Sequence, residues 1–287
     1  MERKQFFLGI LVFLACLNLL AWNAVFETSR ASELKVVFFD VGQGDAIFIE
    51  TPQGHQILID GGPGSSILEK LSREMPFYDR SLDLVILTHP DSDHLSGLIE
   101  ILKKYRIDYV LWTGAIRNTP EFKEWENSLQ TRKLKSKIAK AGQRIIAAEA
   151  IFDILYPFEN LEGKEAQNSN NTSVVTRLSF NKTSFLFPGD IDKSVEQKLI
   201  ENQSNLDSDT LKVAHHGSKT SSSEEFLKQV SPKIAVIQCS KNNPYGYPHK
   251  DTLNNLEKYG IEVLRTDEIG DIKIISNGKF LTQIKNQ

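Results

Sequence analysis

Cysteine is scarce in this chain of 287 residues, which contains only Cys16 and Cys239. Cys16 lies inside a long apolar run, so the rest of the chain has one thiol and cannot form an internal disulfide. Cys239 follows the apolar segment 234–237, which favours a small buried hydrophobic side chain over a nucleophile. A disulfide-stapled scaffold is therefore excluded.

An excess of basic residues is also missing, because 34 Lys and Arg face 37 Asp and Glu, giving a net charge of −3. No global positive field would recruit nucleic acid, although a local patch could still hold a phosphate. The sequence has no short-period repeat and no low-complexity tract. Its length and its hydrophobic fraction of 40% are ordinary for one sizeable globular domain.

One long apolar run does occur, at residues 6–26, where a single glycine and two asparagines interrupt it. About 20 such residues span the hydrocarbon core of a bilayer as a helix. Arg3 and Lys4 precede the run, which favours a cytoplasmic N-terminus and an exported domain. A cleaved signal peptide is the alternative, although no clean small-x-small cleavage site follows. We expect a membrane anchor at 1–30 and a folded domain at 31–287.

The most informative feature is a loop that follows the apolar segment 82–87 and packs four potential metal ligands into six residues: His89, Asp91, Asp93 and His94. Two imidazoles and two carboxylates form a mixture that suits Zn, Mn or Fe. One ion could not use all four side chains from so short a loop without strain, so two adjacent ions are expected. A chance cluster of polar residues on a turn is the alternative.

Other apolar segments end in the same way, with Asp or His directly after them: Asp60, Asp190, and the pair His215 and His216. Solubility alone does not explain so many strand ends that carry ligand-type side chains. Together with the four-ligand loop, they favour a metal site over a chance cluster.

The hydrophobic patterns predict two strand-rich halves, each ending in helices, which indicates an α/β fold of two sheets packed face to face with helices outside, an αββα sandwich. Ligands at strand ends would then converge on one edge. Helices are expected at 95–106, 120–140, 192–202, 223–229 and 251–259. Strands are expected at 34–40, 45–50, 56–60, 82–87, 109–112, 144–149, 152–155, 173–180, 183–188, 210–214 and 234–238.

Taken in order, these motifs resemble the metallo-β-lactamase superfamily and, within it, the hydrolase domain of the ComEC family of DNA-uptake competence proteins. The resemblance covers about residues 33–287. The multi-helix membrane channel of full-length ComEC has no counterpart in this sequence. It implies a metal-dependent phosphodiesterase, most plausibly a DNase, with a metal-bridging hydroxide as nucleophile. It rests on the D-V-G-Q-G-D signature at 40–45, Asp60-Gly61-Gly62, the loop from His89 to His94, and segments 170–175, 189–190, 215–218 and 243–249.

The resemblance also implies ligands for two divalent ions, Zn or Mn. The first ion would be held by His89 and Asp91, the second by Asp93, His94 and His215, and both by Asp190.

Departures from the family pattern affect these assignments. Most superfamily members have His at the positions of Asp91 and Asn171, and an oxygen-rich site moves the preference from Zn towards Mn or Mg. ComEC-like domains usually have His at the position of Tyr247, which leaves the role of His249 open.

Several further residues are candidates by their position in these motifs. Asp60 would orient the metal loop through hydrogen bonds. His216, Ser218 and His249 are candidates for contacting the phosphate or protonating the leaving oxygen, with ordinary turn chemistry as the alternative. Asp93 is a catalytic candidate because it would hold the ion that activates the attacking water. Four lysines in a stretch without acidic residues are candidate DNA-backbone contacts, or else a solvated helix face. The remaining substrate or supporting candidates are Asp40, Asp45, Asn171 and Tyr245, and the four lysines are Lys133, Lys135, Lys137 and Lys140.

We therefore expect a membrane-anchored, extracytoplasmic DNase that acts on DNA next to a separate uptake channel. One alternative is a hydrolase of another phosphodiester, such as a wall polymer or a nucleotide. Another is a non-catalytic DNA-binding subunit of an uptake machine. The presence of six ligand-type residues together argues against the last, because a domain without activity has no physical need for all of them.

Overall fold

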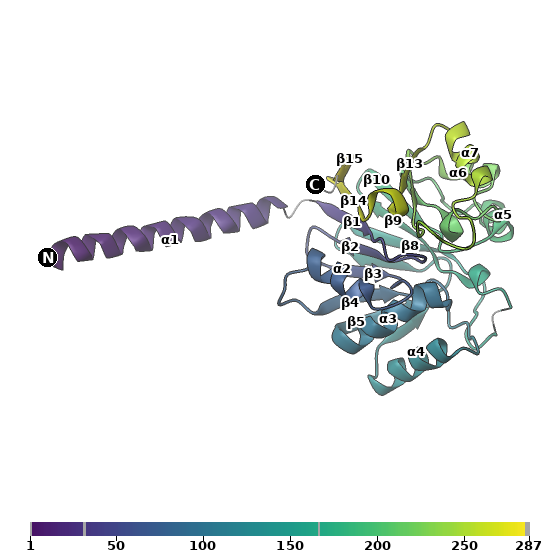
Figure 1. Ribbon diagram of the computed structural model, residues 1–287, viewed down its shortest axis with the longest axis horizontal. Coiled ribbons are helices and arrows are strands. Elements are labelled where there is room, and N and C mark those ends of the chain that lie inside the picture. Colours follow the sequence, from purple (N-terminus) through teal and green to yellow (C-terminus); the bar gives the residue numbers. More distant parts are fainter. Residues whose placement is uncertain (1, 31–32, 166, 285–287) are drawn as a thin grey trace.

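The computed structural model describes residues 2–30, 33–165 and 167–284. One helix, α1 (Glu2–Arg30), leads into a body of two sheets (Figure 1). The segment Arg3–Trp22 has a mean hydropathy of 2.1 and no buried residue, so it is long and apolar enough to cross a membrane. A signal sequence near an N-terminus passes the same test of length and composition.

The first sheet has eight strands in the order β15-β14-β1-β2-β3-β4-β5-β6. Its first hairpins are antiparallel, whereas β3 to β6 run parallel, so the carboxyl ends of these four strands meet at one edge. The strands are β1 (Leu34–Phe38), β2 (Ile47–Glu50), β3 (Gln56–Ile59), β4 (Ser81–Ile86), β5 (Arg106–Trp112), β6 (Ser136–Ile138), β14 (Ile272–Ser276) and β15 (Leu281–Ile284).

The second sheet has seven strands in the order β13-β12-β11-β10-β9-β8-β7. Strands β10 to β13 are parallel, so their carboxyl ends also share one edge. The strands are β7 (Arg144–Ala147), β8 (Ala150–Tyr156), β9 (Val175–Phe180), β10 (Thr183–Phe187), β11 (Thr210–Lys212), β12 (Ile234–Ile237) and β13 (Glu262–Arg265).

Three hydrophobic clusters hold the layers together. The first fills the space between the sheets, where the rings of Phe38 and Phe187 lie 6.2 Å apart. The second joins the first sheet to α2 (Ser66–Glu74), α3 (Ser92–Lys104) and α4 (Pro120–Thr131). The third joins the second sheet to α5 (Lys193–Glu201), α6 (Glu224–Val230) and α7 (Lys250–Lys258). The αββα sandwich predicted from the sequence is thereby confirmed.

The long helix predicted at 120–140 is wrong in its second half. Helix α4 ends at Thr131, and Lys133 has a φ of 51°, a left-handed conformation that a helix cannot continue through. The chain then forms the edge strand β6. The sequence patterns also failed to indicate α2, the short helix α8 (Thr266–Ile269) and the last three strands.

Candidate metal centre

Asp60 follows β3 and organises the loop that carries the candidate ligands. Its Oδ1 accepts a hydrogen bond from the Thr88 backbone N–H at 2.8 Å, and its Oδ2 accepts one from the Thr88 hydroxyl at 2.6 Å. The same Oδ2 lies 2.8 Å from Nδ1 of His94. Because this contact fixes the hydrogen of His94 on Nδ1, its Nε2 lone pair faces the site. This is the geometry expected of the orienting role predicted for Asp60.

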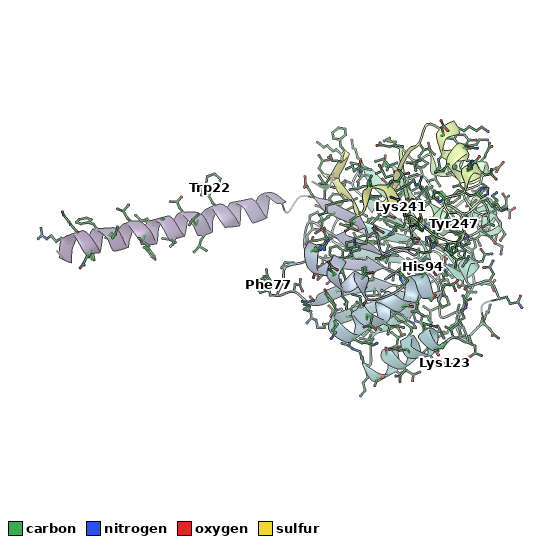
Figure 2. The ribbon with its side chains drawn as sticks, in the orientation of Figure 1. Trp22, Phe77, His94, Lys123, Lys241 and Tyr247 are labelled. Carbon is green, nitrogen blue, oxygen red and sulfur yellow. The ribbon has the colours of Figure 1, made fainter. Side chains whose placement is uncertain are left out.

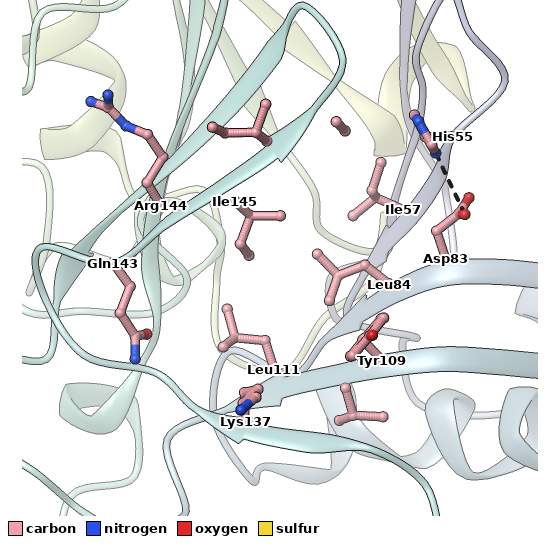
Figure 3. Close-up of a pocket in the computed structure, with 13 residues that line it drawn as sticks. His55, Ile57, Asp83, Leu84, Tyr109, Leu111, Lys137, Gln143, Arg144 and Ile145 are labelled. Carbon is pink, nitrogen blue, oxygen red and sulfur yellow. Dashed lines mark ion pairs between the residues drawn. The ribbon is translucent and has the colours of Figure 1, made fainter.

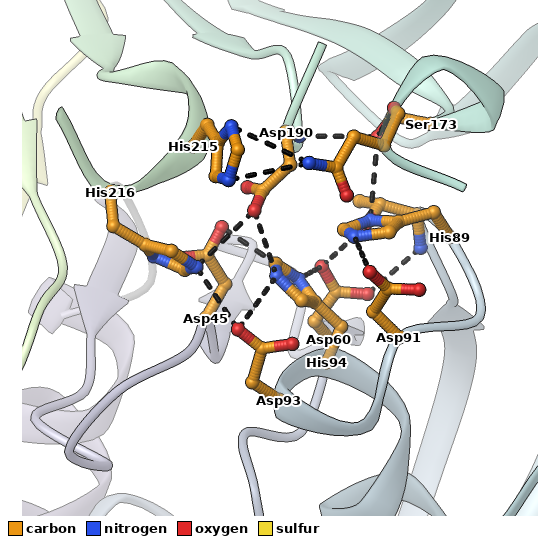
Figure 4. A network of polar contacts seen from close by, with 12 residues as sticks. Asp45, Asp60, His89, Asp91, Asp93, His94, Ser173, Asp190, His215 and His216 are labelled. Atoms are coloured by element: carbon orange, nitrogen blue, oxygen red, sulfur yellow. Dashed lines mark hydrogen bonds and ion pairs between the residues drawn. The ribbon is translucent and has the colours of Figure 1, made fainter. Parts of the chain in front are cut away.

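Asp190 follows the carboxyl end of β10 and lies among the other acids and histidines of a buried cluster (Figure 4). Its Oδ2 is 3.3 Å from Nε2 of His94, which belongs to the first sheet's side, and 3.2 Å from Nε2 of His216, which follows β11. Oδ2 of Asp93 is 3.3 Å from the same His216 nitrogen. The ring of His89 lies 4.1 Å from that of His94. Ligands separated by more than a hundred residues in sequence therefore meet at one point.

The donor atoms of this cluster fit a divalent cation. Within the part of the chain that the structure describes, Nε2 of His89, His94 and His216 and Oδ1 of Asp190 are buried without a hydrogen bond. Buried polar atoms normally have partners, so convergent atoms without them indicate a ligand. Two overlapping triads have ligand atoms within 4.8 Å of one another: His89, His94 and Asp190, and Asp93, His94 and His216. Imidazole and carboxylate together suit Zn or Mn.

The charges of the cluster are strongly coupled. Burial disfavours the charged form of His94, but Asp190, Asp60 and Asp93 outweigh it and raise the pKa of His94 well above its ordinary value. His216 behaves in the same way: burial lowers its pKa, but Asp190 and Asp45 outweigh burial and raise the pKa well above its ordinary value. Burial and the charge of His94 lower the pKa of His89 to about 3. The carboxylates around these two rings thus favour positive charge at Nε2, where a divalent ion would compete with a proton.

A buried lysine, Lys212, belongs to the same network and was not among the predicted residues. It is 1% exposed, forms an ion pair with Asp45 and lies 3.7 Å from Oδ1 of Asp190. Asp45 in turn lies 3.3 Å from Nδ1 of His216, whose other contact is the backbone carbonyl of Gln238 at 2.9 Å. The signal was present in the sequence, because Lys212 is the one charged residue in an apolar strand directly before the two histidines.

The glycines of the signature at 40–45 also have a structural reason. Gly44 has a φ of 135°, and a Cβ added there would lie 2.1 Å from the backbone oxygen of Asp93. Only glycine lets this loop approach the metal loop so closely. The loop thereby brings Asp45 next to His216.

The two adjacent histidines make different contacts. His215 is predicted as a ligand of the second ion. Its Nε2 lies 3.3 Å from the amide nitrogen of Asn170 and 3.4 Å from the Tyr247 hydroxyl. His216, predicted only as a catalytic candidate, is the one that reaches Asp190. Both residues have left-handed φ values, 51° and 54°, so successive rings project in different directions. His216 is therefore the residue of the pair whose Nε2 contacts Asp190.

The first ion's predicted site is less complete than the second's. Asp91 forms an ion pair with Arg117 through Oδ1, and its Oδ2 is 3.9 Å from Nε2 of His89. The amide of Asn171 is occupied by Asp192, to which its Nδ2 donates at 2.7 Å. Asn171 therefore does not face the cluster, and Arg117 is a neighbour that no sequence motif indicated.

Three other candidates lie away from the metal ligands. The backbone N–H of Asp40 donates to Asp271 at 2.7 Å. The Ser218 hydroxyl is 2.9 Å from that of Thr220. His249 precedes α7 and caps it, accepting a hydrogen bond from the Asp251 N–H at 3.2 Å. No contact between these side chains and Asp190 is found among the described residues.

The predicted basic stretch does not gather beside the cluster. Lys133 lines a hollow against α4, and Lys135 lies over the ring of Tyr109 at 5.1 Å. Lys137 lines a cleft of about 550 Å³ between the sheets, together with Ile57, Leu84 and Leu111 (Figure 3). Lys140 is exposed in the turn after β6. His55, which precedes β3, and Asp83 of β4 line the same cleft, and the residues that line it include none of the candidate metal ligands.

Comparison with known proteins identifies the class. Residues 39–241 match the family described as the metallo-beta-lactamase superfamily, and the chain belongs to it. The chain is 32% identical over 260 residues to ComE operon protein 3 of Bacillus subtilis, covering 85% of this chain and 33% of that protein. It is 30% identical over 249 residues to competence protein ComA of Neisseria gonorrhoeae, covering 86% and 33%. The predicted similarity to competence proteins is thus confirmed, and the chain spans about a third of the length of these relatives.

Comparison with solved structures finds the same fold in other proteins. The structure of Igni18, a metallo hydrolase from the archaeon Ignicoccus hospitalis, superposes with a TM-score of 0.56 at 16% identity, covering 84% of this chain and 98% of that one. This likeness concerns the fold alone. Together, the family and the buried His and Asp cluster define a metal-dependent hydrolase that is related to competence proteins.

Proposed function

We propose that this hydrolase is a phosphodiesterase whose substrate is DNA, that it uses two divalent ions, and that α1 anchors it with residues 31–287 outside the cytoplasm. The observation that carries the proposal is the position of Asp190, whose carboxylate lies between His94 and His216 and close to Nε2 of His89, which has no hydrogen bond among the described residues. The similarity to competence proteins supports DNA as the substrate.

In this proposal, His89 and Asp190 would hold one ion, joined by Asp91 if it leaves Arg117. Asp93, His94, His216 and Asp190 would hold the other. Bound divalent ions would polarise the phosphoryl oxygens and lower the pKa of a water molecule.

The chain's own residues prepare this chemistry. Asp60 keeps the Nε2 atom of His94 pointed at the site, and the carbonyl of Gln238 does the same for His216. Lys212 offsets part of the negative charge that Asp45 and Asp190 concentrate in a buried volume. Burial of the cluster excludes bulk water, which strengthens each of these electrostatic contacts.

DNA cleavage tests the proposal most simply. The full chain, purified in detergent, would be incubated with single- and double-stranded DNA and Mn²⁺ or Zn²⁺. We expect metal-dependent cleavage that Asp93→Asn abolishes. Asp108→Asn, which changes a carboxylate on β5 that pairs with Arg106, is the matched control and should leave cleavage unchanged.

Two outcomes would redirect the proposal. Hydrolysis of a small phosphodiester without cleavage of DNA or RNA would assign the site to a nucleotide or wall polymer. DNA binding without any hydrolysis would make the chain a binding subunit.

The membrane placement has a separate test. A protease added to spheroplasts should digest the body of the protein while a fragment containing Arg3–Trp22 remains in the membrane. Full protection would reverse the proposed orientation, and a shorter mature form without this segment would show that it is a cleaved signal. The similarity to competence proteins also leads us to propose that the hydrolase works together with a DNA-uptake channel.

A further inference from the structure

A row of aromatic rings leads from the metal ligands to the surface. The ring of Tyr247 lies 6.4 Å from that of His216 and 5.5 Å from that of His215. The ring of Tyr245 stacks on Tyr247 at 5.5 Å with an interplanar angle of 21°. Tyr245 is 64% exposed, although it carries a large apolar ring. A ring stacked on one face and open to solvent has room for another flat group.

The loop that carries these rings is held in place. The Asn243 side chain brackets it, donating to the backbone oxygens of Ser240 and Tyr247 at 2.9 and 2.7 Å and accepting from the Tyr247 N–H at 2.8 Å. The His249 N–H donates to the Gly217 carbonyl at 2.9 Å, which ties the loop to the one that bears His216. The exposed ring is therefore positioned before any ligand binds, which reduces the entropy lost on binding.

The charge of the surrounding loops favours an anionic ligand. Segments 210–223 and 239–250 contain no Asp or Glu, whereas Lys219 and Lys241 are exposed on them. Figure 2 labels Lys241 together with Tyr247, from the same loop. A flat ring beside a basic rim and a metal cluster combines the three features that recognise a base, its backbone phosphates and the bond to be broken.

We propose that Tyr245 is a stacking platform for an unpaired nucleobase next to the phosphodiester at the metal centre, and that the chain consequently prefers single strands or frayed ends over intact duplex. The inference rests on the proposed function, because it names the form of the DNA substrate for the same site. Duplex bases already stack on each other and expose no face to a tyrosine, whereas single-stranded bases stack on aromatic side chains irrespective of sequence.

Fluorescence of 2-aminopurine tests this directly. A single-stranded oligonucleotide with one 2-aminopurine would be titrated with the full chain in detergent and EDTA, so that no cleavage occurs. We expect quenching on binding by the wild-type protein. Tyr245→Leu should lose the quenching and bind about tenfold more weakly, whereas Tyr245→Trp should retain both.

Two controls separate stacking from other effects. An oligonucleotide with abasic sites in place of bases should bind the wild type and Tyr245→Leu equally, because it offers nothing to stack. Tyr78→Leu removes another exposed tyrosine, 76% exposed, and should change nothing. Its neighbour Phe77 lies at the side of the body nearest α1 and far from His94 (Figure 2).

The outcomes distinguish this inference from the proposed function. If the wild type cleaves DNA and Tyr245→Leu binds and quenches like the wild type, the stacking platform is refuted while the nuclease stands. If 2-aminopurine is quenched through Tyr245 but no DNA is cleaved with any metal, the platform stands and the nuclease falls. Equal quenching with a duplex probe would also refute the preference for single strands.

Discussion

Replacing Asp60 by Asn should remove metal affinity while leaving the fold intact. Asn has nearly the shape of Asp and tolerates the left-handed φ of 56° at this position. Its amide oxygen can still accept from the Thr88 backbone. Its NH₂ group, however, would donate to Nδ1 of His94, where the carboxylate now accepts. The hydrogen of His94 would then move to Nε2, the nitrogen that faces Asp190.

The size of the effect follows from these contacts. Loss of a partner that orients a metal-ligating histidine typically lowers metal affinity about 10- to 100-fold, which is about 1.4–2.7 kcal/mol. Alanine is a poorer probe. It would leave the Thr88 N–H and the His94 Nδ1 without hydrogen-bond partners, which costs about 1–3 kcal/mol of stability each. It would also strain the left-handed backbone by about 1–2 kcal/mol. That total approaches the whole stability of a domain, so alanine would test folding instead of metal binding.

Isothermal titration of metal-free wild type and Asp60→Asn with Mn²⁺ or Zn²⁺ measures the difference, and circular dichroism checks that both are folded. Asp83→Asn, which changes a half-buried carboxylate of β4 that pairs with His55, is the matched control. A folded Asp60→Asn protein with wild-type metal affinity would refute the assignment of Asp60 as the residue that sets the His94 tautomer.

Three further results are expected. His216→Gln should lower the number of bound ions, whereas His215→Gln should leave it unchanged, as measured by metal analysis after gel filtration; the reverse order would restore the sequence-based assignment. Gly44→Ala should lower the melting temperature and the metal content together, because its Cβ would collide with the backbone of Asp93. In EDTA, thermal stability should fall as pH rises above about 6.5. His94 and His216 have raised pKa values in the folded protein, so their protonated forms stabilise the fold fully below that pH, and this stabilisation is lost as they deprotonate. A flat or rising profile in EDTA would contradict that electrostatic description.

Much of the site could be predicted because its ligands follow apolar strands. Buried parallel strands are recognisable as apolar runs, and their carboxyl ends meet at one edge, so Asp60, Asp190 and the loop from His89 to His94 were found before the fold was known. The prediction of a helix at 120–140 was wrong in its second half, because that charged half has no strong hydrophobic period. Pairing with β5 makes residues 136–138 a strand. Local patterns do not contain such tertiary contacts.

For a similar reason, the sequence could not show which ring, that of His215 or that of His216, contacts Asp190. Adjacent residues differ only in the direction of their side chains, which two left-handed backbone conformations set here. Arg117 lies far from every motif in sequence and meets Asp91 only through folding. Lys212 could have been noticed, because a lone lysine in an apolar strand must either reach solvent or find a buried carboxylate. It finds Asp45.

Metal content of the wild-type chain and of Asp190→Asn tests the central claim most directly, since Asp190 is proposed to contact both ions. Mass-spectrometric metal analysis after dialysis should find about two ions per wild-type chain and almost none in Asp190→Asn. Asp190→Asn protein that is folded and keeps its ions, or wild-type protein that binds no divalent metal, would contradict the proposed metal centre.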